Sequence, residues 1–217
     1  MKAVEAWAEP DRVRIFGNAM DPIEAFILAG GASSRMGTDK ARLLLEGQTL
    51  IERIANTLLK VASSVTIVGR DVDDPRLKST ADVYLQWGAL GGVHAALAAA
   101  RTEWALLVAC DLPFVTAELF TRMAALRKNH DAVAPVQRDG RPQPLCSLYR
   151  VDRCLGPATE LIEAGQRRPV NLLNSVNTRW LPFAELQDLD NAEKFFVNIN
   201  TPADYYDATR KGDVVQH

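Results

Sequence analysis

The sequence predicts an α/β fold in which a mostly parallel sheet is covered by helices on both faces. Two observations support this prediction: short apolar segments alternate with amphipathic ones, and the connectors between them are short. The composition, 47% hydrophobic and 24% charged over 217 residues, is that of a globular protein. We expect a single domain over 23–210, preceded by an N-terminal extension, 1–22, that matches no clear period.

The first half of the chain supplies most of the alternation. Strands are predicted at 25–28, 63–69, 104–110 and 131–136, and a weaker strand or extended loop at 81–86. Helices are predicted at 49–61, at 91–100 and at 116–129, with Thr49 and Thr116 as N-caps of the first and third. Segment 70–80 is predicted to be a polar connector.

The pattern of apolar segments is less regular in the second half, but no linker separates the two halves. A short strand is predicted at 145–150, and a helix at 151–165 that Gly156 and Pro157 interrupt. Segment 176–183 is predicted to be an edge strand. A short strand around Asn198 is expected to precede a helix capped by Thr201.

Charge, hydropathy and cysteine usage exclude several classes of protein. A net charge of -2 gives no support for a nucleic-acid-binding surface. No apolar run approaches the roughly 20 residues of a membrane helix, and the N-terminus lacks the apolar region of a secretory signal. The three scattered cysteines, Cys110, Cys146 and Cys154, predict neither a disulfide frame nor a zinc site, so a reducing cytoplasm is expected.

A glycine-rich segment, LAGGASSRMGTDK, follows the first predicted strand and ends at Lys40. Glycine and small residues let backbone N–H groups converge on an anion at close range. Arg35 is suited to bidentate bonds with phosphate oxygens, and Lys40 supplies a point charge. The segment is neither a GxxxxGK[ST] loop nor a GxGxxG fingerprint. We expect a phosphate site of another kind; the alternative is a glycine-rich turn with two solvated cations.

Asp111 follows the most apolar predicted strand. A carboxylate at the end of a buried strand is costly unless a cation meets it. Mg²⁺ takes one or two carboxylates together with phosphate oxygens and waters, and ligands bind beyond the carboxyl ends of parallel strands. We therefore expect Asp111 to bind Mg²⁺, with Mn²⁺ as a substitute. The alternative is a turn or helix-capping aspartate, which Pro113 favours.

Two further groups of polar and small residues extend this pattern. Asp82 and the glycines of GALGG, 88–92, suit a base, sugar or phosphate, or else form a glycine-broken loop before a helix. Asn198 and Asn200 are two residues apart, so on a strand both point to the same face. There they are suited to chelating a metal or orienting hydroxyls and phosphates; the alternative is a pair of turn-capping amides.

The histidines do not suggest a covalent mechanism. His94 lies in an alanine-rich segment, His130 at a predicted helix end and His217 at the terminus, with no Ser/His/Asp grouping in view. A phosphate loop, a strand-end aspartate and paired amides together favour nucleotidyl transfer, which needs charge neutralisation and in-line positioning. Segments RPQPL, 141–145, and GQRR, 165–168, suit an anionic substrate or an ordinary surface loop.

The segment LAGGASSRMGTDK resembles the LAGGxSxRMGxDK signature of the molybdenum cofactor guanylyltransferases. Asp82, GALGG, CDLPF, QPLCSLYR, GQRR and VNINTPAD follow in the matching order, so the resemblance covers about 24–208. It implies a three-layer, Rossmann-like fold of the glycosyltransferase A type, with a nucleotide-binding first half and an acceptor-binding second half. It further implies that the phosphate of molybdopterin attacks the α-phosphate of Mg-GTP, giving the guanine dinucleotide cofactor and pyrophosphate.

The resemblance also implies roles for individual residues. The catalytic residues would be Arg35, Lys40 and Asp111, with Asp111 also the metal ligand. The nucleotide-binding residues would be Leu28, Ala29, Gly30, Gly31, Lys40, Asp82, Gly88 and Asp111. The acceptor-binding residues would be Gln143, Pro144, Arg168, Asn198 and Asn200.

Other functions share parts of this pattern. A molybdopterin cytidylyltransferase or a sugar-phosphate nucleotidyltransferase would use a similar loop, and GALGG, where the family usually has GPLGG or GPLAG, bears on base selection. QPL favours guanylyl transfer, and Asp39–Lys40 argues against isoprenoid-type cytidylyltransferases, which usually carry Pro-Lys. A non-catalytic nucleotide-binding regulator or cofactor chaperone would be favoured by loss of Arg35, Lys40 or Asp111. Transient contacts with cofactor-delivery proteins or acceptor enzymes are also expected.

Overall fold

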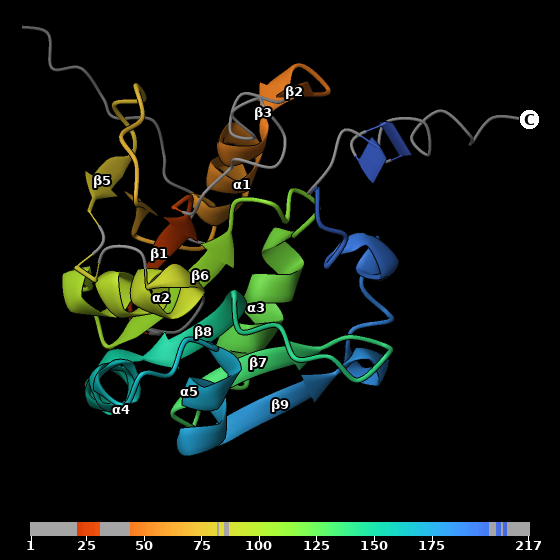
Figure 1. Ribbon diagram of the computed structural model, residues 1–217. Coiled ribbons are helices and arrows are strands. Elements are labelled where there is room, and N and C mark those ends of the chain that lie inside the picture. Colours follow the sequence, from red (N-terminus) through yellow and green to blue (C-terminus); the bar gives the residue numbers. More distant parts are fainter. Residues whose placement is uncertain are drawn as a thin grey trace, which may run out of the picture.

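The computed structural model describes residues 21–30, 44–81, 83–84, 87–199, 203–204 and 206–207. Seven strands form one sheet: β1 (Ile23–Leu28), β4 (Ser64–Val68), β5 (Lys78–Thr80), β6 (Trp104–Ala109), β7 (Ala132–Val136), β8 (Cys146–Arg150) and β9 (Thr178–Pro182). Their order is β5-β4-β1-β6-β8-β7-β9 (Figure 1). β8 is antiparallel to β6 and β7, and the other pairs are parallel, which confirms the predicted sheet.

Helices cover both faces of the sheet. They are α1 (Leu50–Leu58), α2 (Gly88–Ala99), α3 (Ala117–Ala125), α4 (Val151–Glu163) and α5 (Val170–Ser175), with 3-10 turns η3 (Phe183–Glu185) and η4 (Ala192–Lys194). α1 and α3 lie on one face of the sheet, and α2, α4 and α5 lie on the other (Figure 1). The buried side chains of the two groups of helices belong to separate core clusters. β2 (Leu44–Leu45) and β3 (Gln48–Thr49) form a separate antiparallel pair. The predicted three-layer fold is confirmed.

Alternation along the central strands assigns side chains to the two layers. In β1, Ala25 and Ile27 face α1 and α3, whereas Phe26 and Leu28 face α2 and α4. All six residues of β6 are buried, since this strand lies between β1 and β8 in the middle of the sheet. A strand covered on both faces needs a continuous apolar run, which is what the sequence 104–109 has.

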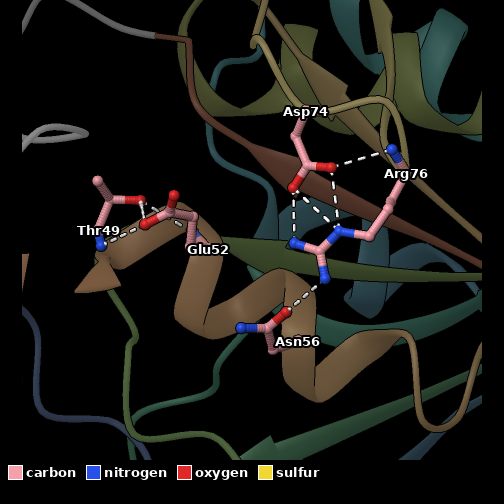
Figure 2. A network of polar contacts seen from close by, with 5 residues as sticks. All are labelled: Thr49, Glu52, Asn56, Asp74 and Arg76. Carbon is pink, nitrogen blue, oxygen red and sulfur yellow. Dashed lines mark hydrogen bonds and ion pairs between the residues drawn. The ribbon is translucent and has the colours of Figure 1, made fainter. Parts of the chain in front are cut away.

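The start of α1 carries the predicted N-cap. The Thr49 hydroxyl accepts a hydrogen bond from the Glu52 N–H at 3.1 Å, and the Glu52 carboxylate accepts one from the Thr49 N–H at 2.7 Å (Figure 2). This reciprocal capping box satisfies two donors that a helix N-terminus otherwise leaves unpaired. Figure 2 also shows Arg76, which binds Asp74 at 2.6 Å and donates to the Asn56 side chain at 3.0 Å. The connector after β4 is thereby fastened to α1.

Two element predictions in the first half are wrong. The predicted polar connector 70–80 contains β5, three half-exposed or exposed residues that pair with β4 through backbone bonds. A strand held by its backbone at a sheet edge has no hydrophobic period for the sequence to reveal. The helix predicted to open at Gly91 opens at Gly88 instead, so GALGG is the first turn of α2.

Two element predictions in the second half of the chain are also wrong. α4 runs without a break through Pro157, because Cys154, Ala158 and Ile162 are buried on one face and this packing outweighs the lost backbone bond. Residues 195–199 form a turn and an irregular segment rather than the predicted strand. The expected cap Thr201 lies outside the described residues.

Within the described ranges, no helix has the length and apolar character needed to cross a membrane. The domain boundaries, 23–210, stay a prediction, because residues 1–20 and 208–217 lie outside the described part of the chain.

Candidate active site

The candidate site lies at the carboxyl ends of the parallel strands. β4, β1 and β6 are neighbours in the sheet, so the segments that follow them emerge along one edge. β8 runs in the opposite direction, so its first residue, Cys146, also lies at this edge. Loops from both halves of the chain therefore meet on a rigid sheet, the usual location of ligand sites in such folds.

The end of β1 lies against the segment that carries Asp111. The Cys110 N–H donates to the Leu28 carbonyl oxygen at 3.1 Å, and the Ala29 N–H donates to the Val68 carbonyl oxygen at 3.0 Å. Leu28, Ala29 and Gly30 are progressively more exposed as the chain leaves the sheet. Asp111 itself is half-buried. The described start of the glycine-rich segment, 28–30, therefore lies beside the loop that carries Asp111. The roles of both segments stay predictions.

Several predicted site residues lie outside the described part of the chain. They are Gly31, Arg35, Lys40, Asp82 and Asn200. Their roles stay predictions.

Asn198 is brought to the same loop by a backbone bond. The Ile199 N–H donates to the Asp111 carbonyl oxygen at 2.9 Å, and the Ile199 side chain is fully buried in a small cluster with Leu45 and Leu50. Asn198 is exposed beside this anchor. The described part of this segment, 195–199, is not a strand. The backbone bond brings Asn198 beside the loop that carries Asp111, and its role there stays a prediction.

Gln143 and Pro144 lie beside the end of β6. The Ala109 N–H donates to the Leu145 carbonyl oxygen at 2.7 Å, two residues before Asp111. The Gln143 N–H donates to the Pro135 carbonyl oxygen at 2.9 Å. The predicted acceptor segment is therefore held between the ends of β6 and β7.

Two buried polar residues that the sequence reasoning missed support this segment. The Ser147 hydroxyl donates to the Gln143 carbonyl oxygen and the Tyr149 hydroxyl to the Pro144 carbonyl oxygen, each at 2.7 Å. Burial raises the pKa of Tyr149 well above its usual value, so the phenol stays a neutral donor. The available signal was the pair of hydroxyl side chains, Ser147 and Tyr149, at alternate positions of the strand CSLYR.

Gly88 and Arg168 come from different halves and lie near a common residue. Gly88 has a positive φ of 71° and opens α2. Trp87, its neighbour, donates from its indole to the Gln166 carbonyl oxygen at 3.0 Å, two residues before Arg168. Both Gly88 and Arg168 are exposed. The Trp87 bond therefore links the segment before α2 to the connection between α4 and α5.

Asp111 has the ligand chemistry that a hard divalent cation prefers. No group of three or more histidine, cysteine or acidic side chains suited to a metal is found among the described residues. Mg²⁺ does not need such a group, because it keeps waters and phosphate oxygens as ligands beside one or two carboxylates. Half-buried Asp111, with the amide of Asn198 in the adjoining segment, fits a cation that arrives with a nucleotide.

Cys146, Cys154 and His94 are buried and are poor candidates for a nucleophile. Burial raises the pKa values of the Cys146 and Cys154 thiols to about 12, so both stay protonated. None of the three cysteines forms a disulfide, and Cys110 is half-buried. His94 is buried between α2 and α4, with its Nε2 3.1 Å from the Thr159 hydroxyl. Among the described residues, Cys146, Cys154 and His94 therefore give no support for a covalent intermediate.

Comparison with known proteins agrees with this geometry. The family model described as a MobA-like NTP transferase domain matches residues 25–178. The chain belongs to this family. The MobA-like NTP transferase chain is 34% identical over 182 residues to a probable molybdenum cofactor guanylyltransferase of Pelotomaculum thermopropionicum, covering 82% of this chain and 87% of that protein. It is thus a member of a nucleotidyltransferase family.

Solved structures of similar proteins share the fold. The structure of molybdopterin-guanine dinucleotide biosynthesis protein A from Archaeoglobus fulgidus matches with a TM-score of 0.72 and 25% identity, over 87% of this chain and 98% of that one. The 2-C-methyl-D-erythritol 4-phosphate cytidylyltransferase of Thermus thermophilus matches with a TM-score of 0.64 and 16% identity, over 87% and 98%. The second likeness shows the fold alone.

Proposed function

We propose that the protein transfers GMP from GTP to the phosphate of molybdopterin, giving the guanine dinucleotide cofactor and pyrophosphate. The observation that carries the proposal is the convergence of three segments on the end of β6. Backbone bonds from Cys110 to Leu28, from Ile199 to Asp111 and from Ala109 to Leu145 join the nucleotide loop, the candidate metal ligand and the acceptor segment. The names of the family's curated guanylyltransferases support the same reaction.

The reaction needs in-line positioning above all. An oxygen of the acceptor phosphate forms a bond to the α-phosphorus of GTP, and the bond from that phosphorus to the bridging oxygen of pyrophosphate breaks. Segments anchored on a sheet hold the two substrates in a fixed relation. The entropy cost of bringing them together is then met on binding and does not add to the barrier of the chemical step. We assign Leu28, Ala29 and Gly30 to the nucleotide, and Gln143 and Pro144 to the acceptor.

Charge neutralisation is the second requirement. We propose that Asp111 holds Mg²⁺, with Mn²⁺ as a substitute, and that Asn198 assists at the same place. When bound, the cation offsets negative charge on the phosphates. Arg35 and Lys40, outside the described residues, are proposed to neutralise the triphosphate from the glycine-rich loop.

The remaining assigned residues complete the two binding regions. We propose that Gly31, Asp82 and Gly88 contact the nucleotide, and that Arg168 and Asn200 contact the acceptor. Three free cysteines are consistent with a reducing compartment, and we place the reaction in the cytoplasm, with transient contacts to cofactor-delivery proteins or acceptor enzymes.

The test is pyrophosphate release by the purified protein with Mg²⁺, molybdopterin and each nucleoside triphosphate in turn. GTP is expected to support turnover and CTP is not. Equal rates with CTP would overturn the guanylyl assignment. No turnover with any nucleotide would favour a non-catalytic nucleotide-binding protein instead.

A further inference from the structure

Trp87 joins the nucleotide side of the structure to the acceptor side. It immediately precedes α2, and its indole N–H donates to the Gln166 carbonyl oxygen at 3.0 Å. The Arg167 guanidinium lies over the Trp87 ring, with its central carbon 4.6 Å from the ring centroid. Trp87 therefore contacts two successive residues of GQRR, a segment that begins the connection between α4 and α5.

The connection held by Trp87 is itself a tight turn. The Gln166 N–H donates to the Leu161 carbonyl oxygen at 2.9 Å, and its side-chain oxygen accepts from the Asn171 amide at 2.7 Å. The Asn171 N–H donates to the Arg168 carbonyl oxygen at 3.0 Å. Because these bonds link Gln166 to both flanking helices, the position of the Arg168 backbone follows from that of Gln166.

A glycine in the first turn of α2 makes room for Trp87. A Cβ placed on Gly91 would lie 2.9 Å from the Trp87 Cβ and 3.1 Å from the Tyr84 carbonyl oxygen. Both distances are too short for an ordinary contact, and one of these atoms belongs to the backbone. Gly91 thus lets the segment before α2 pack directly on the helix, because the Trp87 Cβ and the Tyr84 carbonyl oxygen occupy the space that a side chain at residue 91 would need.

We propose that Trp87 is a positioning residue for acceptor binding: it holds residues 166–168 so that Arg168 is presented to the acceptor phosphate. This inference rests on the proposed function. The indole N–H holds the backbone of the connection at Gln166. Stacking on the Trp87 ring restricts the side chain of Arg167, the residue next to Arg168. A loop ordered before the acceptor arrives does not have to be ordered by binding, so the acceptor binds more tightly.

The test compares two variants with matched controls. Trp87→Phe keeps an aromatic face for Arg167 and removes the N–H donor, whereas Arg167→Gln removes the cation and keeps the donor. The controls make the same two substitutions elsewhere. They are Trp180→Phe, at a half-buried residue of β9, and Arg153→Gln, at an exposed residue of α4. KM for molybdopterin and KM for GTP are measured for each, together with amide hydrogen exchange over 164–171.

Trp87→Phe and Arg167→Gln are each expected to raise the acceptor KM about 3- to 10-fold, as the loss of one interaction predicts, and to leave the GTP KM and kcat within about twofold. Amides of 164–171 should exchange faster in Trp87→Phe, and the controls should match the wild type. An unchanged acceptor KM in both variants, or equal rises for the two substrates, would overturn this inference and leave the proposed function standing. Failure of the wild type to turn over would overturn the proposed function, and this inference with it.

Discussion

The backbone N–H of Ile199 donates to the carbonyl oxygen of Asp111 at an N···O distance of 2.9 Å. This bond holds the segment that carries Asn198 against the loop after β6. On the other side of that loop, the Cys110 N–H donates to the Leu28 carbonyl oxygen at 3.1 Å. Because both bonds use backbone atoms, the charge on Asp111 can be removed while the arrangement of the segments is kept.

Asp111→Asn therefore separates catalysis from folding. We expect kcat to fall about 100-fold or more, since the amide cannot offer the charge that holds a cation among phosphates. The melting temperature should change by less than about 2 °C, as for a substitution that keeps backbone bonds and size. Pyrophosphate release and thermal melting measure the two effects. The control Asp188→Asn, at an exposed partner of Arg122, should keep full activity, and an active Asp111→Asn would refute the metal assignment.

Ile199→Ala tests the anchor itself. Ile199 is fully buried against Leu45 and Leu50, so truncation leaves a cavity and is expected to cost about 2–5 kcal/mol of unfolding free energy. Val197→Ala, at a residue that is 40% exposed two positions earlier, should cost no more than about 0.5 kcal/mol. Denaturant unfolding measures both. If the two variants were equally stable, residue 199 would not be the anchor of this segment.

Thr49→Ala removes half of the capping box at the start of α1. We expect a loss of about 1 kcal/mol, since the Glu52 N–H then has no side-chain acceptor at the N-cap. Thr121→Ala is the matched control, because the Thr121 hydroxyl only donates to a carbonyl within α3. Equal unfolding midpoints for the two variants would show that the cap contributes nothing specific.

His94 is expected to make stability depend on pH. Burial lowers its pKa, so below about pH 6.5 the unfolded chain binds a proton more readily than the folded one. The contribution of neutral His94 is fully present above that pH and is lost as the pH falls toward the folded pKa. The stability advantage of the wild type over His94→Gln should shrink between pH 7 and pH 5, measured by denaturant unfolding. A constant difference across this range would contradict the prediction.

The sequence was most informative where local chemistry and burial agree. Thr49 and Thr116 cap their helices as predicted, and Asp111 follows a strand whose six residues are all buried. Each of these features depends on neighbours within a few residues, or on a continuous apolar run between two helical layers. Pattern alone was therefore sufficient for the central strands of the sheet, its helical layers and the end of β6.

Features that depend on distant backbone contacts were not visible in the sequence. β5 is held by pairing with β4, and α4 accommodates Pro157 because its buried face packs in the layer shared with α2. The contact between Trp87 and Gln166 spans 79 residues and uses a carbonyl group, which every residue has. No residue type marks such an acceptor, so the contact between Trp87 and the GQRR segment could not be predicted from the sequence.

The most direct test of guanylyl transfer is to follow the α-phosphate. With GTP labelled at the α-phosphorus, Mg²⁺ and molybdopterin, the label should appear in a product that contains the pterin, with one pyrophosphate released for each label transferred. With GTP labelled at the γ-phosphorus, the label should appear only in pyrophosphate. Pterin product carrying the γ label, or α label found only in free GMP, would contradict transfer of GMP to the acceptor phosphate.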